Sequence, residues 1–125
     1  MNFDTEFINC VDEIQRVALE IYGKYDLEKS MLWMTEEFGE FFKSIRKEED
    51  QKDIAGEMGD LLAWIFCIGN ILDIKVSDAL KLTMEKEITR QLRTYNRLKY
   101  AKNIKYVKDV DRNYICLFDY LFISS

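Results

Sequence analysis

The chain has 125 residues, enough for one domain, and its hydrophobic and charged fractions of 48% and 33% are those of a folded globular protein. It contains no proline, only 5 glycines and no histidine, which disfavours turn-rich β architectures and excludes histidine-based zinc sites and catalytic triads. The net charge of −5 disfavours stable nucleic-acid binding, although the first 60 residues carry 16 acidic and 7 basic side chains and the remainder carry 7 and 11.

Two long helices are predicted in the first half of the chain. The first runs from about Phe3 to Tyr22 and is ended by Gly23, and the second runs from about Asp26 to Lys47. Large apolar residues recur in both at spacings of three and four, which predicts one buried stripe on each helix. The stripe residues are Phe3, Phe7, Val11, Ile14, Ala18 and Ile21 in the first helix, and Met31, Met34, Phe38, Phe41, Phe42 and Ile45 in the second.

Two more helices are predicted in the second half. The third runs from about Gln51 to Leu72, with Asp50 as its cap, and is apolar nearly all round beyond Leu61. Such a helix is either central in its own fold or buried between subunits, so a homodimer or homotetramer is expected. The fourth runs from about Ser77 to Tyr100. Its expected core residues are Leu80, Met84, Ile88, Leu92 and Tyr95.

The predicted fold class is therefore all-α. Residues 1–100 are expected to form a four-helix bundle-like core, as a dimer or a dimer of dimers, and residues 101–125 a C-terminal extension of the same domain. The longest apolar stretch, residues 61–72, is too short to span a bilayer, which needs about 20 residues, so no membrane association is expected. The acidic N-terminus and three widely spaced cysteines favour a cytoplasmic protein.

Two pairs of acidic residues stand out on the second and third predicted helices. Glu37 and Glu40 are three residues apart, as are Glu57 and Asp60, so each pair projects from one side of its helix. A short connection favours an antiparallel hairpin, in which all four carboxylates converge on one partly buried place. Unpaired buried carboxylates must protonate, pair with cations or bind metal. An all-oxygen ligand set is the one that Mg²⁺ or Mn²⁺ prefers.

The ordinary explanation for a glutamate-rich helix is a solvated acidic face. Glu57 argues against it, because this residue projects between Leu61 and Trp64 on the apolar side of its helix. Three glycines close to the acidic pairs each cost about 1 kcal/mol relative to alanine inside a helix, which predicts close helix approach there. They are Gly39, Gly56 and Gly59.

The acidic pattern resembles that of a known family. Glu-Glu-x-x-Glu at residues 36–40, followed by Glu-x-x-Asp at residues 57–60, is similar to the motif of the MazG-like all-α nucleotide pyrophosphohydrolases. The resemblance covers roughly residues 30–93. It implies Mg²⁺-dependent hydrolysis of nucleoside triphosphates, dNTPs or non-standard NTPs among them, between the α- and β-phosphates to give a monophosphate and pyrophosphate. It also implies that Glu37, Glu40, Glu57 and Asp60 are the metal ligands.

Further candidate site residues surround this motif. Glu36 could orient or deprotonate the attacking water, or be a solvated helix residue. Lys86 and Arg90 begin a basic stripe on the fourth helix, and the resemblance implies that they contact phosphates. Trp33 is a candidate for stacking on a base, and Asn70 for recognising a base or phosphate edge or for joining helices instead. Trp64 is expected to be a core residue.

Two alternative functions remain open at this point. Phosphoribosyl-ATP pyrophosphatases share a similar acidic pattern, but their usual histidine shortly after the aspartate is replaced here by Trp64. A helical interaction module that has kept the acidic residues without catalysis is the alternative from another class, and it predicts no saturable binding of Mg²⁺ or Mn²⁺.

Overall fold

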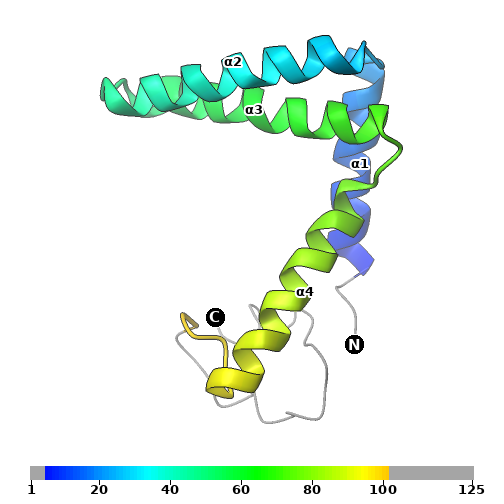
Figure 1. The fold of residues 1–125 in the computed structure, drawn as a ribbon, viewed down its shortest axis with the longest axis vertical. Helices are drawn as coiled ribbons and strands as arrows, with labels where there is room; N and C mark the ends of the chain where they lie inside the picture. The colour runs from blue at the N-terminus through cyan, green and yellow to red at the C-terminus, as the bar shows by residue number, and fades with distance from the viewer. Residues whose placement is uncertain (1–4, 102–125) are drawn as a thin grey trace. The chain divides into compact units, whose positions relative to one another are not determined.

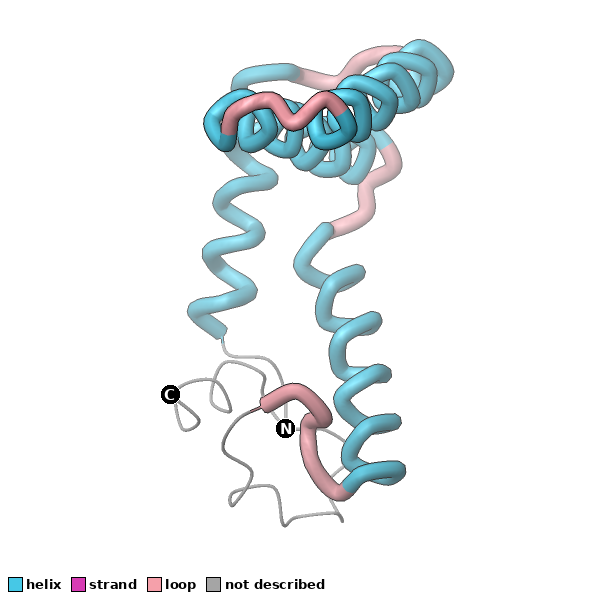
Figure 2. Tube along the Cα trace, turned by 90° about the vertical axis from the view of Figure 1, so that its left-hand side faces the viewer, coloured by secondary structure: helices cyan, strands magenta, loops and turns pink. Residues whose placement is uncertain are grey.

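The computed structural model describes residues 5–101 of the chain. Its helices are α1 (Thr5–Tyr22), α2 (Leu27–Arg46), α3 (Gln51–Ile71) and α4 (Val76–Tyr95), as Figure 1 shows. The described residues contain no strand (Figure 2), which confirms the all-α prediction. The predicted C-terminal extension lies outside the described residues from residue 102 onward.

The chain forms two compact units. Of the described residues, 13–76 make up one unit, and 5–12 and 77–101 belong to the other. The first unit contains most of α1 together with α2 and α3, and it carries the acidic residues identified above. The second contains the start of α1 and nearly all of α4.

Helices α2 and α3 form an antiparallel hairpin and lie side by side along their length (Figure 1). Each helix begins at an aspartate whose carboxylate accepts a backbone N–H of the first turn: Asp26 from Lys29 at 2.9 Å, and Asp50 from Asp53 at 3.1 Å. Between the helices, Glu48 adopts a left-handed conformation with φ of 53°. That turn lets the chain reverse within a few residues, as the short charged connection predicts.

Small polar residues, and not the large apolar ones, are the most buried side chains of α2. Ser30 and Ser44 are fully buried, and each hydroxyl donates to a backbone carbonyl of its own helix or helix cap at 2.7 Å. The predicted apolar stripe is therefore only partly correct. Four of its members on α2 are exposed in a single chain, namely Met31, Phe38, Phe42 and Ile45, and so are Ile14 and Ile21 on α1.

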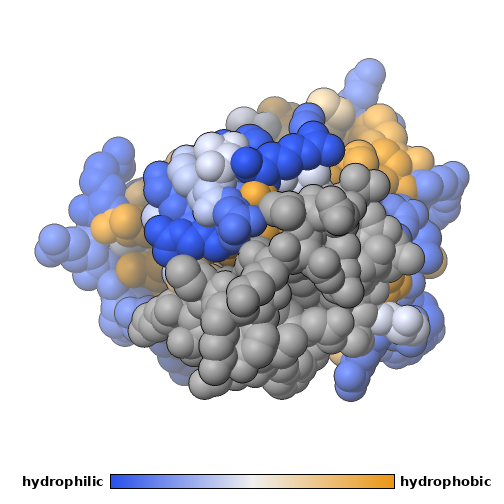
Figure 3. Space-filling view, turned by 90° about the horizontal axis from the view of Figure 1, so that it is seen from below, coloured by the Kyte–Doolittle hydropathy of each residue, from blue (hydrophilic) through white to orange (hydrophobic). Residues whose placement is uncertain are grey.

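The reason for this difference is the direction in which α2 faces α3. At about 100° per residue, Ser30, Glu37 and Ser44 share one side of α2, which is the side buried in the hairpin. The large apolar residues lie about a quarter-turn away and remain at the surface. Figure 3 shows apolar side chains of this kind at the surface as orange patches among hydrophilic ones.

The second unit has a small core of its own. Ile88 and Leu92 on α4 are 5% and 3% exposed and pack against Phe7 and Ile8 of α1. Helix α4 ends at Tyr95, earlier than the predicted Tyr100. The following residue, Asn96, has φ of 57°, and a left-handed asparagine is a common helix terminator.

Helix α3 is unusually apolar for its length. By length and composition alone it meets the requirement for crossing a membrane, with a mean hydropathy of 1.3, and it is the one helix among the described residues that does. The sequence prediction considered only the shorter run of residues 61–72. In the single chain, 17% of its most apolar stretch is buried, and the same helix carries Glu57 and Asp60 of the acidic pairs.

The glycines near the acidic pairs do not serve the purpose predicted for them. A Cβ atom added at Gly39, Gly56 or Gly59 would meet no atom of the described chain within 4 Å. The expectation that they permit close helix approach within the chain is therefore wrong. Gly69, which was not singled out from the sequence, is the helical glycine that is closely packed.

Candidate metal centre

Three of the four predicted metal ligands lie together between α2 and α3. Glu37 and Glu40 project from α2 and Glu57 from α3, and one carboxylate oxygen of each lies within 4.8 Å of the other two. Glu37 and Glu57 are half-buried, whereas Glu40 is exposed. Asp60, the fourth predicted ligand, is exposed and lies outside this trio, one turn further along α3.

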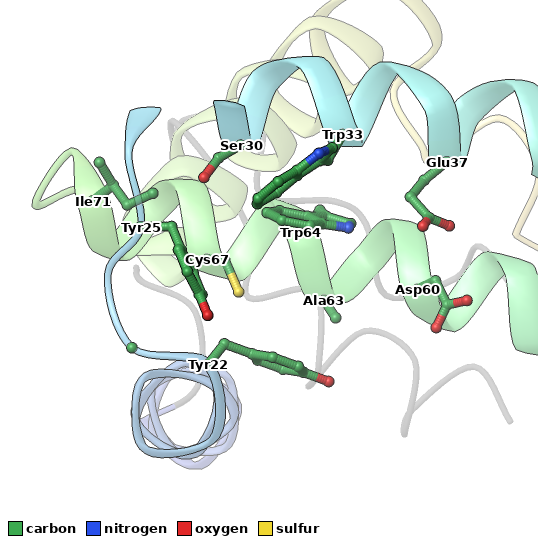
Figure 4. Close-up of a pocket in the computed structure, with 11 residues that line it drawn as sticks. Tyr22, Tyr25, Ser30, Trp33, Glu37, Asp60, Ala63, Trp64, Cys67 and Ile71 are labelled. Carbon is green, nitrogen blue, oxygen red and sulfur yellow. The ribbon is translucent and has the colours of Figure 1, made fainter. Parts of the chain in front are cut away.

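Asp60 nevertheless acts electrostatically on the trio. Its charge, together with that of Glu40, raises the pKa of both Glu37 and Glu57, although loss of solvent contact is the larger cause at each residue. The cluster thus keeps its carboxylates close together against their mutual repulsion. Figure 4 shows Glu37 and Asp60 projecting from facing parts of α2 and α3.

Two carboxylate oxygens in this cluster lack a hydrogen-bond partner. Oε2 of Glu37 and Oε2 of Glu57 are both shielded from solvent and accept no hydrogen bond from the described residues. The ion pairs found between residues 5 and 101 do not include either glutamate. Buried acceptors without a donor are costly, and a cation would remove that cost. The residues therefore fit a hard divalent ion, which takes oxygen ligands.

Glu36, the predicted catalytic residue, lies beside the cluster on the exposed side of α2. Its charge is the smallest of the contributions that raise the pKa of Glu37. Its carboxylate is not one of the three that lie within 4.8 Å of one another. Its role in activating water stays a prediction.

An aromatic pocket adjoins the acidic cluster. Its cavity volume is about 370 Å³, and Glu37 and Asp60 line one end of it (Figure 4). Trp33 of α2 and Trp64 of α3 face each other with ring centroids 5.8 Å apart and planes at 52°, and Tyr25 meets the edge of Trp33 at 6.1 Å. The remaining lining residues are Tyr22, Gly23, Ser30, Ala63, Cys67 and Ile71.

Several of these pocket residues were not identified from the sequence. Trp64 was expected in the core, but it is half-buried and lines the pocket. Tyr22 is the last residue of α1 and Tyr25 lies in the connection to α2, whereas Cys67 lies on the same side of α3 as Asp60 and Ala63. The signal for Cys67 was available, since residues at i, i+3 and i+7 share a helix side. No local signal indicated that the α1–α2 connection would fold over that side.

The basic residues predicted to contact phosphate belong to the other unit. Lys86 and Arg90 are exposed on α4 and, with Arg93, line an open groove along that helix. The Arg90 guanidinium donates to the Glu87 carboxylate, with Nε 2.9 Å from Oε2, and this hydrogen bond lowers the pKa of Glu87 to about 2. Arg90 is thus already ion-paired with Glu87, which makes Lys86 the more available cation of the two for binding phosphate.

Asn70 uses its side chain within the chain itself. Its amide donates to the backbone carbonyl of Gln15 on α1 at 3.2 Å, and it is not among the described residues that line the pocket. Of the two uses predicted for Asn70, the joining of helices is the one that this hydrogen bond serves.

A comparison with protein families matches the part of the chain that holds this site. A model described as the MazG nucleotide pyrophosphohydrolase domain matches residues 25–93, which are 69 of the 125 residues. The matched range includes all of the acidic cluster, Trp33 and Trp64, and the start of the basic stripe on α4. No curated protein and no solved structure matches the chain significantly.

Proposed function

Because the chain belongs to the MazG nucleotide pyrophosphohydrolase family, we propose that it hydrolyses nucleoside triphosphates at the bond between the α- and β-phosphates, using Mg²⁺. Water adds across that phosphoanhydride, so the products are a nucleoside monophosphate and pyrophosphate. The family assignment supports nucleotide pyrophosphohydrolysis as the class of activity. We propose further that Mg²⁺ is the metal and that dNTPs and non-standard NTPs are the substrates.

The observation that carries the proposal is the pair of unpartnered oxygens on Glu37 and Glu57. They belong to a trio of carboxylates held within 4.8 Å, and one member of the trio, Glu37, lines the end of a pocket large enough for a nucleobase. A cation at the trio and a base in the pocket would place the phosphates of a nucleotide between them. That arrangement accounts for both features with one ligand.

The roles of the acidic residues follow from their positions. Glu37, Glu40 and Glu57 would hold the ion, with Asp60 completing its ligand set from the next turn of α3. When bound, Mg²⁺ or Mn²⁺ supplies neutralisation of phosphate charge and a lowered pKa for a coordinated water. Glu36 would accept a proton from the attacking water, because it is a nearby carboxylate that the trio does not include.

The pocket would hold the base. Trp33 and Trp64 offer ring faces on which any base can stack, and stacking is largely independent of base identity. Asn70 would act on this end of the site without contacting the base, through its hydrogen bond to Gln15 of α1. Lys86 and Arg90 are our candidates for binding the β- and γ-phosphates, because they are exposed cations on a single side of α4.

A second copy of the chain is the proposed partner. Seven large apolar side chains with exposed fractions of 38–58% project from one uncharged side of the α2–α3 hairpin, opposite the pocket by helical projection. They are Met31, Phe38, Phe42, Ile45, Met58, Leu62 and Ile65. An apolar, charge-depleted centre of this kind is typical of homodimer interfaces, so we propose a homodimer, or a homotetramer built from it.

The proposal is tested with a panel of dNTPs and NTPs in the presence of Mg²⁺, with the products resolved by chromatography. Pyrophosphate and a monophosphate are expected from wild type, and at least a hundredfold lower kcat from Glu57→Gln. Glu28→Gln, which removes an exposed carboxylate from the first turn of α2, is the matched control and should retain activity.

Other products would exclude the proposed reaction. Release of orthophosphate as the primary product would place cleavage at a different bond. Hydrolysis of phosphoribosyl-ATP but of no nucleoside triphosphate would favour the phosphoribosyl-ATP pyrophosphatase alternative. Calorimetric titration with Mn²⁺ that detects no saturable binding would favour the inactive interaction module.

A further inference from the structure

A buried glutamine joins α1 to the connection between α3 and α4. Gln15 is only 8% exposed, and both ends of its side-chain amide are used. Its Nε2 donates to the carbonyl of Ile74 at 2.8 Å, and its Oε1 accepts from the backbone N–H of Val76, also at 2.8 Å. The backbone carbonyl of Gln15 accepts a third hydrogen bond, from the side-chain amide of Asn70 at 3.2 Å. Three hydrogen bonds therefore connect one residue of α1 to the end of α3, to the loop beyond it and to the first residue of α4.

Gly69 makes this close contact between the two helices feasible. A Cβ atom at that position would lie 3.1 Å from Nε2 of Gln15, 3.1 Å from the carbonyl oxygen of Ile74 and 3.1 Å from Cγ2 of Val76. These distances are tighter than ordinary van der Waals contact. Because one of the three atoms belongs to the backbone, any side chain at residue 69 would push α1 and the loop apart.

Neighbours of these residues on α1 and α3 line the aromatic pocket. Tyr22 lies seven residues after Gln15, two helical turns along the same side of α1, and with Gly23 it forms one wall of the pocket. On α3, Cys67 and Ile71 lie on either side of Gly69 and Asn70 in the sequence, and they belong to the wall that α3 contributes. The hydrogen bonds of Gln15 thus connect the two helices that carry these walls.

We propose that Gln15, Gly69 and Asn70 are positioning residues that set the width of the pocket and thereby the affinity for the base of the substrate. The inference rests on the proposed function, since it assigns the base to this pocket. None of the three residues contacts the acidic trio, so they act on the binding of the base and not on the hydrolytic step.

The physical reason is that the Ile74 carbonyl and the Val76 N–H both depend on the Gln15 side chain for these hydrogen bonds. Replacing Gln15 by methionine keeps the length of the side chain but leaves the Val76 N–H and the Ile74 carbonyl without partners. Buried backbone groups without partners are costly, so the loop and α1 would separate to admit water. The wall that carries Tyr22 would then move away from the wall that carries Cys67.

Steady-state kinetics with two substrates tests the inference. One is a deoxynucleoside triphosphate, and the other is the triphosphate of abasic deoxyribose, which carries the same phosphates without a base. For Gln15→Met we expect KM for the deoxynucleotide to rise about tenfold, in line with the loss of one base-stacking interaction, with kcat changed less than twofold. KM for the abasic substrate should not change. Gln15→Glu keeps an acceptor for the Val76 N–H but places a second acceptor against the Ile74 carbonyl, so it should raise this KM at least as much.

The matched control is Arg16→Met, the same replacement at the neighbouring exposed position of α1. Within residues 5–101, Arg16 donates to Glu13 and Glu20 of its own helix, so both KM values should remain those of wild type. An equal loss for both substrates in Gln15→Met would indicate a general structural defect and overturn the inference, as would unchanged KM for the deoxynucleotide. If Gln15→Met does not fold, Asn70→Ala, which removes one of the three hydrogen bonds, is subjected to the same comparison.

A binding measurement separates this inference from the proposed function. Quenching of the Trp33–Trp64 fluorescence by a nucleoside, which has no phosphates, is recorded in EDTA for wild type and Gln15→Met. Weaker quenching in the variant would support the positioning role even if wild type hydrolysed no triphosphate. Equal quenching curves would contradict the positioning role even if hydrolysis occurred as proposed.

Discussion

Glu37→Gln should change the stability of the protein in opposite directions depending on whether a divalent ion is present. In wild type, a carboxylate oxygen of Glu37 lies within 4.8 Å of one from Glu40 and one from Glu57. Two unit charges at that distance repel by about 0.9 kcal/mol in bulk water, and by more where water is partly excluded. The substitution removes two such repulsions and breaks no hydrogen bond of Glu37 Oε2 among the described residues.

We therefore expect Glu37→Gln to be more stable than wild type in EDTA by about 1–2 kcal/mol, or about 3–10 °C in Tm for a domain of this size. With Mg²⁺ or Mn²⁺ the order should reverse. A ligand at one hundred times its Kd stabilises the folded state by about 2.7 kcal/mol, and the variant should lose most of this gain. In the variant, residue 37 carries no charge, so a bound ion has less repulsion to neutralise and stabilises the folded state less.

The assay is thermal unfolding followed by circular dichroism at a fixed protomer concentration, in EDTA and in a series of metal concentrations. Glu28→Gln is the control and should respond to metal as wild type does. A lower Tm for Glu37→Gln in EDTA, or an equal gain in Tm from metal in both proteins, would refute the electrostatic reasoning. The first result would mean that Glu37 is a stabilising residue, and the second that it is no ligand.

Three further predictions concern pH, base binding and assembly. Because the folded state raises the pKa of Glu37 and Glu57, protonation of these residues favours folding. The free energy of unfolding without metal, measured with urea, should therefore fall as pH rises from about 4.5 through the folded pKa values. Metal affinity, measured by calorimetry, should fall as pH is lowered through the same window. Trp33→Ala should raise KM for nucleoside triphosphates by about 5- to 150-fold with a smaller effect on kcat, and equal losses in both parameters would argue against stacking. Phe42→Glu should convert the oligomer to a monomer in light scattering, whereas Leu82→Glu, at an exposed leucine of α4 outside the apolar side of the hairpin, should not.

Local sequence patterns were sufficient to predict the helices and the pairing of the acidic residues. Asp26 and Asp50 each precede a run with helical periodicity, and both cap the helix that follows. The spacing of three residues places Glu37 with Glu40 on one side of α2, because a helix repeats every 3.6 residues. The short charged connection predicted the antiparallel hairpin, and with it the meeting of Glu57 with the pair on α2.

The burial of α2 was not predictable in the same way. Its large apolar residues define a stripe, but periodicity cannot say whether that stripe faces a helix of the same chain or another molecule. Ser30 and Ser44, which carry no apolar signal, are the residues buried in the hairpin. The end of α4 was placed too late because the apolar pattern continues beyond the left-handed turn at Asn96.

The pocket and the hydrogen bonds that border it depend on contacts between residues far apart in the chain. Gln15 and Val76 are brought together only when α1 packs against the end of α3, and a glutamine in an amphipathic helix is ordinarily solvent-exposed. Helix formation and capping depend on neighbours within four or five positions, so the sequence alone determines them. Which face is covered, and what an amide such as that of Asn70 bonds to, depends on the free energy of the whole packed arrangement, and only the tertiary structure decides it.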